Sequence, residues 1–415
     1  MVSSTAAWPS PVVLDVHAAD DMFKHSMDMT STPELGVMAY FRAGMQIQDA
    51  VRQIATWHSG SLRAVERVCD FASGYGRSTR FLAAEVLPDR VWAAEILPEA
   101  VEFQGSVLGV HAVLSETDPA DLEIDQRFDL IYVSSLFSHL PDRTWAEWLD
   151  RLWGLLADDG LLIMSVHDES TMRPEHGVMG DSGLVFLPIT EVAALDTEDY
   201  GATFVAEHYV AKAIVEVTGS SRYRRLPRSL CFHQDLYLVP GTAGFSDREL
   251  NFVKGPNGAV DESAFMDDGT VSLVGWSCSV DDPSGPVEVE VLLDGVTLSV
   301  TYLERGIARP DVATHLGDER AANCGWRISV PMRRSHRVAE SVLMVRAVAS
   351  DRRFVLHCAP AMSFFDVPPP PARRAELFAA ERFEHLAHLL RHEGLAGVGR
   401  KAAGVPKRIA SKVKR

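Results

Sequence analysis

The sequence lacks any apolar run long enough to cross a membrane. A transmembrane helix needs about 18 or more consecutive apolar residues, and the 415 residues contain no such stretch. The N-terminus also lacks a basic segment followed by an apolar one, which a secretory signal requires. We therefore expect the chain to be cytoplasmic.

Cysteine is scarce as well. Structural zinc sites and disulfide frameworks need paired or clustered cysteines, whereas the five here are scattered and form no Cys-x-x-Cys pair. They are Cys69, Cys231, Cys278, Cys324 and Cys358. The sequence therefore predicts neither a disulfide framework nor a zinc site, no other metal-ligand cluster stands out, and the pattern suits a reducing compartment.

Positive charge is in deficit except near the C-terminus. The net charge is −17, yet residues 373–415 hold eleven Lys and Arg against four Glu. The rest of the chain therefore carries a net charge near −24, which disfavours nucleic acid as a partner of the folded body. Residues 368–415 form a predicted helical, basic tail. It either lies on an anionic membrane surface at the inner face of the cell membrane or extends into solvent.

The chain is long enough for two or three domains. Residues 1–60 form a predicted N-terminal helical extension, with a helix that begins at Pro33. Residues 61–242 alternate apolar runs with helical patterns, which predicts a doubly wound, Rossmann-like α/β sheet. Residues 243–269 are polar and form a predicted linker. The short alternating strands of residues 270–367 predict an all-β sandwich-like domain.

Five apolar runs predict the parallel strands of the α/β sheet. These runs are residues 67–71, 91–96, 111–114, 128–134 and 161–167. Nearly continuous apolar strands are expected where helices cover both faces of a sheet. Between the last two runs, Trp145, Trp148, Leu149 and Leu152 recur at helical spacing and predict an amphipathic helix. A further strand is predicted at residues 235–239.

A strand that breaks into a glycine loop is the most informative segment. Residues 68–71 are followed by Ala72-Ser73-Gly74-Tyr75-Gly76 and then by a helical pattern. Glycine lets the backbone approach a ligand closely, and the N-terminus of a helix offers unpaired N–H groups. Glu95 follows Gly74 by 21 residues and ends the next predicted strand. A carboxylate at this place accepts hydrogen bonds from ribose hydroxyls.

Two classes of cofactor share this arrangement. A dinucleotide site needs a third glycine three residues after Gly76, where this sequence has Thr79. The carboxylate of Asp70, four residues before Gly74, would repel a pyrophosphate. S-adenosylmethionine (SAM) carries an ammonium and a sulfonium, so the same carboxylate would attract it. The loop therefore favours SAM over NAD(P).

Together these motifs resemble class I SAM-dependent methyltransferases over roughly residues 35–240. Residues 70–76 look like the first motif of that family, and residues 128–140 look like its fourth-strand motif. The family often has glycine where this sequence has Ala72 and Ser73. The resemblance implies a SAM-binding enzyme. Its implied cofactor contacts are Tyr40, Asp70, Ala72, Gly74, Gly76, Glu95, Ile96, Ser115, Glu116 and Ser134.

Two histidines are candidates for a general base. His139 follows the fourth predicted strand and His167 ends the fifth, where the carboxyl ends of parallel strands face a ligand. Methyl transfer needs a base only when the acceptor must lose a proton, and the pKa of imidazole suits that task near neutral pH. Each histidine could instead be a polar loop residue. No Asp/Asn-Pro-Pro-Tyr/Phe motif follows the fourth strand, which disfavours amino-group methylation of bases or glutamine.

The predicted β-domain indicates the class of methyl acceptor. Gly275-Trp276, the Asp294-Gly295 turn and Arg309-Pro310-Asp311-Val312 resemble a β-domain that accompanies glycosyltransferases of bacterial surface-polysaccharide synthesis. The resemblance implies O-methylation of a sugar, a glycan or a related hydroxylated acceptor in envelope polysaccharide metabolism. Two alternatives stay open. One is a small-molecule methyltransferase with a structural β-domain, and the other is a non-catalytic scaffold that keeps a SAM-like pocket.

Overall fold

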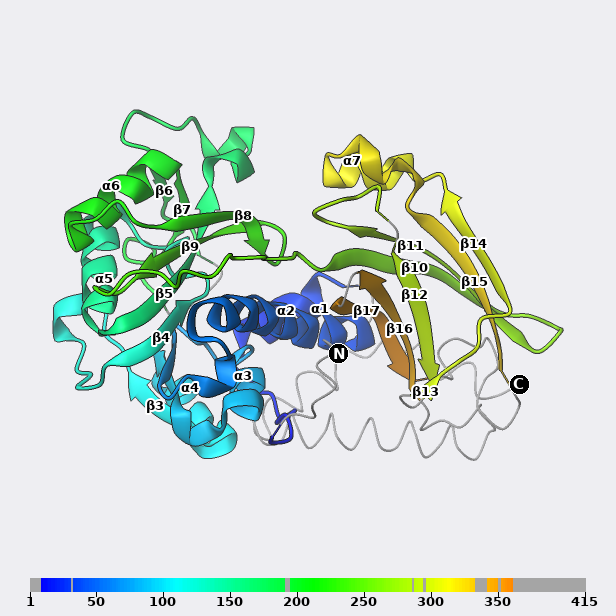
Figure 1. Ribbon diagram of the computed structural model, residues 1–415, viewed down its shortest axis with the longest axis horizontal. Coiled ribbons are helices and arrows are strands. Elements are labelled where there is room, and N and C mark those ends of the chain that lie inside the picture. The colour runs from blue at the N-terminus through cyan, green and yellow to red at the C-terminus, as the bar shows by residue number, and fades with distance from the viewer. Residues whose placement is uncertain are drawn as a thin grey trace, which may run out of the picture.

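The computed structural model describes residues 9–30, 33–190, 195–285, 287–293, 296–332, 342–349 and 352–360. These residues form an α/β part and a β-sandwich, which lie side by side with helix α2 (Pro33–Ser59) between them (Figure 1). None of the helices in these ranges is both long enough and apolar enough to span a membrane. The predicted basic tail over 368–415 lies outside the described residues, so its membrane contact stays a prediction.

A mainly parallel sheet forms the α/β part. Its strands are β1 (Val68–Phe71), β2 (Val91–Glu95), β3 (His111–Leu114), β4 (Phe128–Val133), β5 (Leu156–Asp168), β8 (Arg224–Leu230) and β9 (Gln234–Pro240). The order is β3-β2-β1-β4-β5, followed by β9 and β8, which run antiparallel to their neighbours. The order reverses between β1 and β4, the switch point at which open α/β sheets bind ligands. The predicted doubly wound, Rossmann-like sheet is confirmed.

A hairpin extends this sheet at the carboxyl end of β5. It consists of β6 (Leu184–Leu187) and β7 (Ala202–Val205), and β7 pairs in parallel with His167 and Asp168. The backbone N–H of Gly201 donates to the carbonyl of His139 at 2.8 Å. The hairpin therefore lies over the loop that follows β4.

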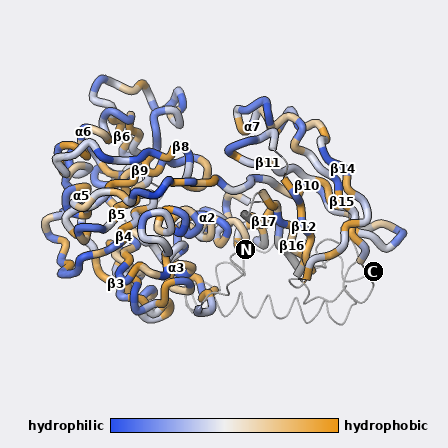
Figure 2. Tube along the Cα trace, viewed as in Figure 1, coloured by the Kyte–Doolittle hydropathy of each residue, from blue (hydrophilic) through white to orange (hydrophobic). Residues whose placement is uncertain are grey.

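Helices cover both faces of the sheet. They are α1 (Asp21–Asp28), α2, α3 (Thr79–Val86), α4 (Pro98–Phe103), α5 (Asp142–Gly154) and α6 (Glu207–Thr218). Alternate residues of one strand enter different cores. Leu130 and Tyr132 of β4 pack with α2, α3 and α4, whereas Ile131 and Val133 pack with α5 and α6. This burial on both sides explains the nearly continuous apolar strands, which appear orange in Figure 2.

Helix α2 begins at Pro33, as predicted, and runs for 27 residues to Ser59. Its side chains Ile47, Val51 and Ile54 are buried in the core with residues of β1, β2 and α3. The predicted N-terminal extension is therefore an integral layer of the α/β part.

Two antiparallel sheets form the β-sandwich. One contains β10 (Pro256–Phe265), β11 (Thr270–Ser279), β15 (Gly325–Pro331) and β14 (Tyr302–Ile307), and the other contains β13 (Val296–Thr297), β12 (Glu288–Leu293), β16 (Val342–Ala349) and β17 (Arg352–Pro360). Inward side chains such as Leu273, Ile328, Val291 and Val345 meet in one core. Helix α7 (Pro310–Leu316) packs against the first sheet. The predicted sandwich is confirmed.

The predicted linker is longer than the observed connection. Strand β10 lies within residues 243–269 and pairs with β11 along its whole length. Residues 261–264 of this edge strand are exposed and mostly polar, which gives the strand the composition of a linker. The connection between the two parts therefore spans only residues 241–255.

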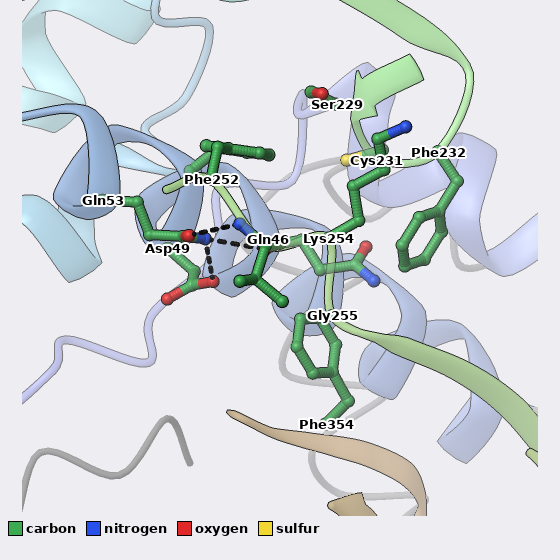
Figure 3. A pocket seen from close by; sticks show the side chains of 12 residues that line it. Gln46, Asp49, Gln53, Ser229, Cys231, Phe232, Phe252, Lys254, Gly255 and Phe354 are labelled. Carbon is green, nitrogen blue, oxygen red and sulfur yellow. Dashed lines mark hydrogen bonds between the residues drawn. The ribbon is translucent and has the colours of Figure 1, made fainter. Parts of the chain in front are cut away.

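This connection is fastened to α2. The side-chain amide of Gln53 donates to the carbonyl of Val253 at 3.0 Å and accepts from its N–H at 2.9 Å. Dashed lines mark hydrogen bonds of Gln53 in Figure 3. One turn later, the indole of Trp57 donates to the carbonyl of Arg248 at 2.7 Å. Beside Gln53 lies a cavity of about 20 Å³, which is room for one water molecule. Helix α2 therefore holds the sandwich against the α/β part.

Gly255 is required at the end of this connection. A Cβ atom there would lie 1.6 Å from Cε2 of Phe354 in β17. We expect Gly255→Ala to lower the free energy of unfolding by about 1–3 kcal/mol, the usual cost of overpacking. Gly154→Ala is the matched control, because an added Cβ there meets nothing within 4 Å. Thermal unfolding of both variants tests this, and equal midpoints would contradict it.

Candidate active site

The carboxyl ends of the parallel strands bring most of the predicted site residues to one edge of the sheet. Those at this edge are Ala72, Gly74, Gly76, Glu95, Ile96, Ser115, Glu116, Ser134, His139 and His167. Asp235, near the start of β9, pairs with Val166 near the end of β5. The turn between β8 and β9 therefore belongs to the same edge.

The loop after β1 has a left-handed backbone at three places. The φ angles are 57° at Ala72, 57° at Gly74 and 75° at Gly76. An added Cβ at Gly76 would lie 2.4 Å from Cδ1 of Leu108, whereas one at Gly74 would meet nothing within 4 Å. Gly76 therefore allows close packing beneath the loop, and the backbone at Gly74 is open to a ligand.

The left-handed backbone of Ala72 lowers the free energy of unfolding by about 1–2 kcal/mol, because Ala72 has a Cβ atom. We expect Ala72→Gly to raise the free energy of unfolding by about 0.5–1 kcal/mol, since glycine adopts this conformation without strain but loses more entropy. Urea unfolding measures the change. Ala83→Gly in α3 should instead destabilise by about 1 kcal/mol, and an equal loss in both variants would contradict this account.

Asp70 lies beneath the loop. It is 1% exposed, and its Oδ2 atom accepts hydrogen bonds from the hydroxyls of Thr79 at 2.6 Å, Ser78 at 3.1 Å and Tyr132. Burial raises the pKa of this carboxyl to about 6, although the hydroxyl hydrogen bonds lower it in part. Asp70 therefore ties β1 to β4 and to the start of α3, and its charge acts on the loop from below.

The raised pKa of Asp70 predicts a pH-dependent loss of stability. The folded state binds the Asp70 proton more tightly than the unfolded state does. The protonated carboxyl therefore stabilises the folded state below about pH 4, and this stabilisation is lost as the pH rises through about 6. The loss amounts to roughly 3 kcal/mol. We expect the plot of unfolding free energy against pH to lack this loss in the Asp70→Asn variant. Denaturant unfolding between pH 4 and 7 tests it, and parallel curves for the two proteins would contradict it.

Glu95 closes the loop from the end of β2. Its Oε2 atom accepts the N–H of Gly74 at 2.7 Å, and its Oε1 atom accepts the N–H of Leu97 at 3.2 Å. The side chain is 6% exposed, and burial raises its pKa while the backbone donors lower it in part. A carboxylate has about four lone-pair sites, so Glu95 can accept further hydrogen bonds from a ligand.

The residues after β2 and β3 differ in burial. The N–H of Ser115 donates to the carbonyl of Glu95 at 2.8 Å, and Ser115 is buried. Ile96 is half-buried beside it, whereas Glu116 is exposed. Ser115 and Ile96 therefore lie next to Glu95, and Glu116 lies at the rim.

Sequence reasoning missed Gln104, which supports the loop from the end of α4 (Pro98–Phe103). This helix continues into a π-helix, Gln104–Leu108, an irregularity frequent at functional sites. The Gln104 amide nitrogen donates to the Ser73 hydroxyl and to the Gly74 carbonyl, both at 2.8 Å. Leu108, at the other end, packs against Gly76. No sequence signal marks the π-helix, because it spans only five residues.

Tyr40 is not exposed at this edge of the sheet. It is 0% exposed, and its hydroxyl donates to Oδ2 of Asp20 at 2.5 Å. Burial and the charge of Asp20 raise the pKa of Tyr40 far above its usual range. The structure therefore places Tyr40 at the junction of α1 and α2, and its predicted cofactor contact stays a prediction.

The segment that precedes α1 lies on the glycine loop. The Arg80 guanidinium donates to the carbonyls of Val13 at 2.9 Å and Asp15 at 2.6 Å, and also to that of Gly76 at 3.0 Å. The ring of His17 stacks on Tyr75 with centroids 4.8 Å apart. Residues 13–17 therefore cover the loop from the outside.

Sequence reasoning also missed two arginines. Arg42 of α2 and Arg77 after Gly76 have neither an ion pair nor a hydrogen bond from their side chains to any part of the chain that the structure describes. Burial lowers the pKa of Arg42. Burial raises the pKa of the Cys231 thiol in the β8–β9 turn, and both arginines lie close enough to lower it in part. Two unpaired cations therefore share one side of the site and suit an anionic group.

His139 has a defined tautomer. Its Nδ1 lies 2.6 Å from the carbonyl oxygen of Gly201, and a carbonyl can only accept, so Nδ1 carries the hydrogen. In the neutral ring Nε2 then holds the lone pair. The ring also stacks on Tyr200 with centroids 4.5 Å apart. The β6–β7 hairpin thus orients His139 as a base.

His167 lies beside His139, with ring centroids 6.1 Å apart, but it has different properties. Its Nε2 lies 3.1 Å from the amide nitrogen of Gln234, which donates to it. Burial lowers the pKa of His167 to about 4, and the charges of His139 and His233 add to this effect. His167 is therefore neutral near pH 7 and is a weak proton acceptor.

The strand end of β4 is held by polar contacts. The N–H of Ser135, whose φ is 66°, donates to the hydroxyl of Ser165 at 2.8 Å. The Ser135 hydroxyl also bonds the amide of Gln234 at 3.0 and 3.2 Å. Ser134 is half-buried at the same turn. This network links the ends of β4, β5 and β9 beneath the two histidines.

Comparisons with known proteins bear on this site. Residues 40–208 match the model of a family described as a methyltransferase domain. No curated protein matches the chain. A SAM-dependent methyltransferase from Clostridium acetobutylicum ATCC 824 is 15% identical, over 53% of this chain and 97% of that one, with a TM-score of 0.34. Magnesium protoporphyrin IX methyltransferase from Synechocystis PCC 6803, with bound S-adenosylhomocysteine, is 17% identical over 53% and 93%, with a TM-score of 0.35.

The family match identifies residues 40–208, the larger portion of the α/β part, as a methyltransferase domain, in agreement with the predicted SAM-dependent methyltransferase and its cofactor SAM. This confirms the predicted enzyme class and cofactor. The matched residues end before β8, so the family model covers no part of the sandwich.

Proposed function

We propose that this chain transfers a methyl group to a hydroxyl oxygen of a sugar, a glycan or a related hydroxylated acceptor. His139 is the proposed general base. The observation that carries the proposal is the hydrogen bond between Nδ1 of His139 and the Gly201 carbonyl, which leaves Nε2 as the accepting nitrogen at the carboxyl end of β4. A base is needed for a hydroxyl acceptor because its proton must leave as the new bond forms.

The residues at the sheet edge fit SAM. Glu95 has unused lone pairs for ribose hydroxyls, and the backbone at Gly74 is open to a ligand. Arg42 and Arg77 offer unpaired positive charge for the methionyl carboxylate. Ser115 lies next to Glu95, where the adenine would sit. When bound, SAM supplies an electrophilic methyl group on a positively charged sulfur.

The chain's own groups then position the acceptor and take its proton. Nε2 of His139 accepts the hydroxyl proton, and the Gly201 carbonyl stabilises the imidazolium through Nδ1–H. The Tyr200 ring holds the plane of His139 by stacking. His167 stays neutral, so it does not oppose the positive charge that develops on His139. Much of the acceleration would come from this orientation of the reacting groups.

The acceptor class rests on two supports. Aromatic rings gather near the two histidines: Tyr200 stacks on His139, and His176 stacks on Phe204 at 4.7 Å. An acceptor ring beside His139 would therefore lie next to aromatic and imidazole side chains, which suits a sugar ring as well as other cyclic acceptors. The second support is the resemblance of the sandwich to β-domains of envelope polysaccharide enzymes, and it underlies the proposed role in that metabolism.

A methyl-transfer assay tests the proposal. The purified chain is incubated with methyl-labelled SAM and a panel of sugars, nucleotide sugars and oligosaccharides, and the product bond is determined by NMR. Amine and thiol compounds of similar size are the controls. We expect label in a methyl ether. Label confined to nitrogen or sulfur would contradict the proposal.

A second candidate is methylation of an unrelated small molecule beside a purely structural sandwich. The reciprocal hydrogen bonds between Gln53 and Val253 favour it, because they fasten the sandwich to α2, as expected of a structural domain. The same panel separates the two candidates. Equal turnover of a simple alcohol or phenol and of the best glycan would favour the second.

A further inference from the structure

Two cysteines that are distant in sequence meet in the sandwich. Cys278 lies near the end of β11, and Cys324 lies just before β15. In the pairing of these strands Trp276 is opposite Gly325, and the N–H of Ser277 donates to the carbonyl of Cys324 at 3.0 Å. The strand register therefore brings the two cysteines together, although their spacing of 46 residues gives no sign of it.

Their side chains share one small apolar cluster with Trp276 and Val312 under α7. The thiols lie close enough to each other to shift each other's pKa. The neighbouring thiol raises the pKa of Cys278 and lowers that of Cys324, and the guanidinium of Arg309 adds to the lowering at Cys324. Cys324 is therefore the better nucleophile of the pair.

The two cysteines also differ in their exposure to solvent. Cys278 is 1% exposed, whereas Cys324 is half-buried and within reach of a small oxidant. Reactive cysteines combine thiolate character, access to solvent and a nearby resolving thiol. Cys324 has all three properties, and Cys278 is the resolving thiol.

We propose that Cys278 and Cys324 form a reversible disulfide in the folded protein when a peroxide is present. The Cys324 thiolate attacks one peroxide oxygen, the O–O bond breaks, and a sulfenic acid and hydroxide result. The sulfur of Cys278 then attacks the Cys324 sulfur, a disulfide forms, and its thiol proton leaves with the hydroxyl as water. In total two thiols are oxidised and one peroxide is reduced to two waters.

The disulfide would fix a segment that is now held by apolar packing and by polar contacts. The N–H of Arg309 donates to the carbonyl of Ala322 at 2.6 Å, and its guanidinium pairs with Asp261 of β10 at 2.6 Å. These contacts hold residues 309–322, which include α7, against the first sheet. A bond from Cys278 to Cys324 would join the end of this segment covalently to β11.

Mass spectrometry of the purified full chain tests the proposal. The reduced protein is treated with hydrogen peroxide, quenched in acid, alkylated and digested. We expect a linked peptide that joins Cys278 to Cys324 and that dithiothreitol releases. We also expect the unfolding midpoint of the sandwich to rise by about 5 °C on oxidation, because the bond closes a long loop of the unfolded chain.

Three variants make the result decisive. Cys231→Ser should leave the linked peptide unchanged. Cys278→Ser should abolish it and leave a sulfenic acid at Cys324, which dimedone traps; Cys324→Ser repeats the test should Cys278→Ser fail to fold. The proposal is overturned if peroxide leaves both thiols alkylatable, if Cys324 is oxidised without linkage, or if it joins another cysteine.

Discussion

Replacing His139 with glutamine is expected to lower kcat about 10²- to 10⁴-fold, the range typical of a lost general base. Glutamine can keep the hydrogen bond to the Gly201 carbonyl through its amide group, but it cannot accept a proton at the position of Nε2. The affinity for SAM should stay within about twofold, because the cofactor groups lie across the switch point on β1 and β2. Steady-state kinetics with the best acceptor, together with a SAM titration, measure both quantities.

Two further variants isolate the role of His139. His111→Gln changes an exposed histidine at the amino end of β3 and should leave kcat unchanged. His167→Gln should lower kcat by less than His139→Gln and should keep the acidic limb of the pH profile of kcat/KM, since His167 does not charge near neutral pH. A profile that loses its acidic limb only in His167→Gln would reverse the assignment.

Replacing Glu95 with alanine is expected to weaken SAM binding about 100-fold. Each hydrogen bond to a charged group contributes about 1.5–3 kcal/mol, and a ribose would form up to two with this carboxylate. The change also removes the acceptor that holds the N–H of Gly74, so the loop loses part of its preorganisation. Equilibrium dialysis with labelled SAM measures the effect.

The matched control is Glu102→Ala, which removes an exposed carboxylate from the neighbouring α4 and should not change the affinity. Glu95→Gln keeps one acceptor and the side-chain length, so an intermediate loss is expected. Equal affinity of wild type and Glu95→Ala would place the ribose elsewhere.

The sequence predicts the central sheet well because its inner parallel strands are buried on both faces. The burial appears as apolar runs at β1, β2, β4 and β5, and the loop chemistry between them follows from Gly74 and Gly76. The position of Glu95 is also predictable, because a carboxylate at the end of the strand that follows a glycine loop lies beside that loop in such a sheet. These features depend on local sequence alone.

Features that depend on tertiary contacts were not predictable in the same way. Gln104 reaches the loop because a π-helix begins at this residue. Arg42 stands out because its side chain has no ion pair or hydrogen bond among the described residues. Strand β10 is an exposed edge, so its composition matches that of a linker. His139 and His167 look equivalent in the sequence, and only their hydrogen-bond partners and burial separate them.

Calorimetric titration with SAM and with its demethylated product tests the central claim most directly. The claim is that the edge formed by the glycine loop, Glu95 and the two unpaired arginines holds the cofactor. We predict one binding event per chain for both ligands, with affinity reduced in Glu95→Ala and in Arg42→Gln/Arg77→Gln. Absence of binding by the wild-type protein, or unchanged binding by both variants, would contradict the account.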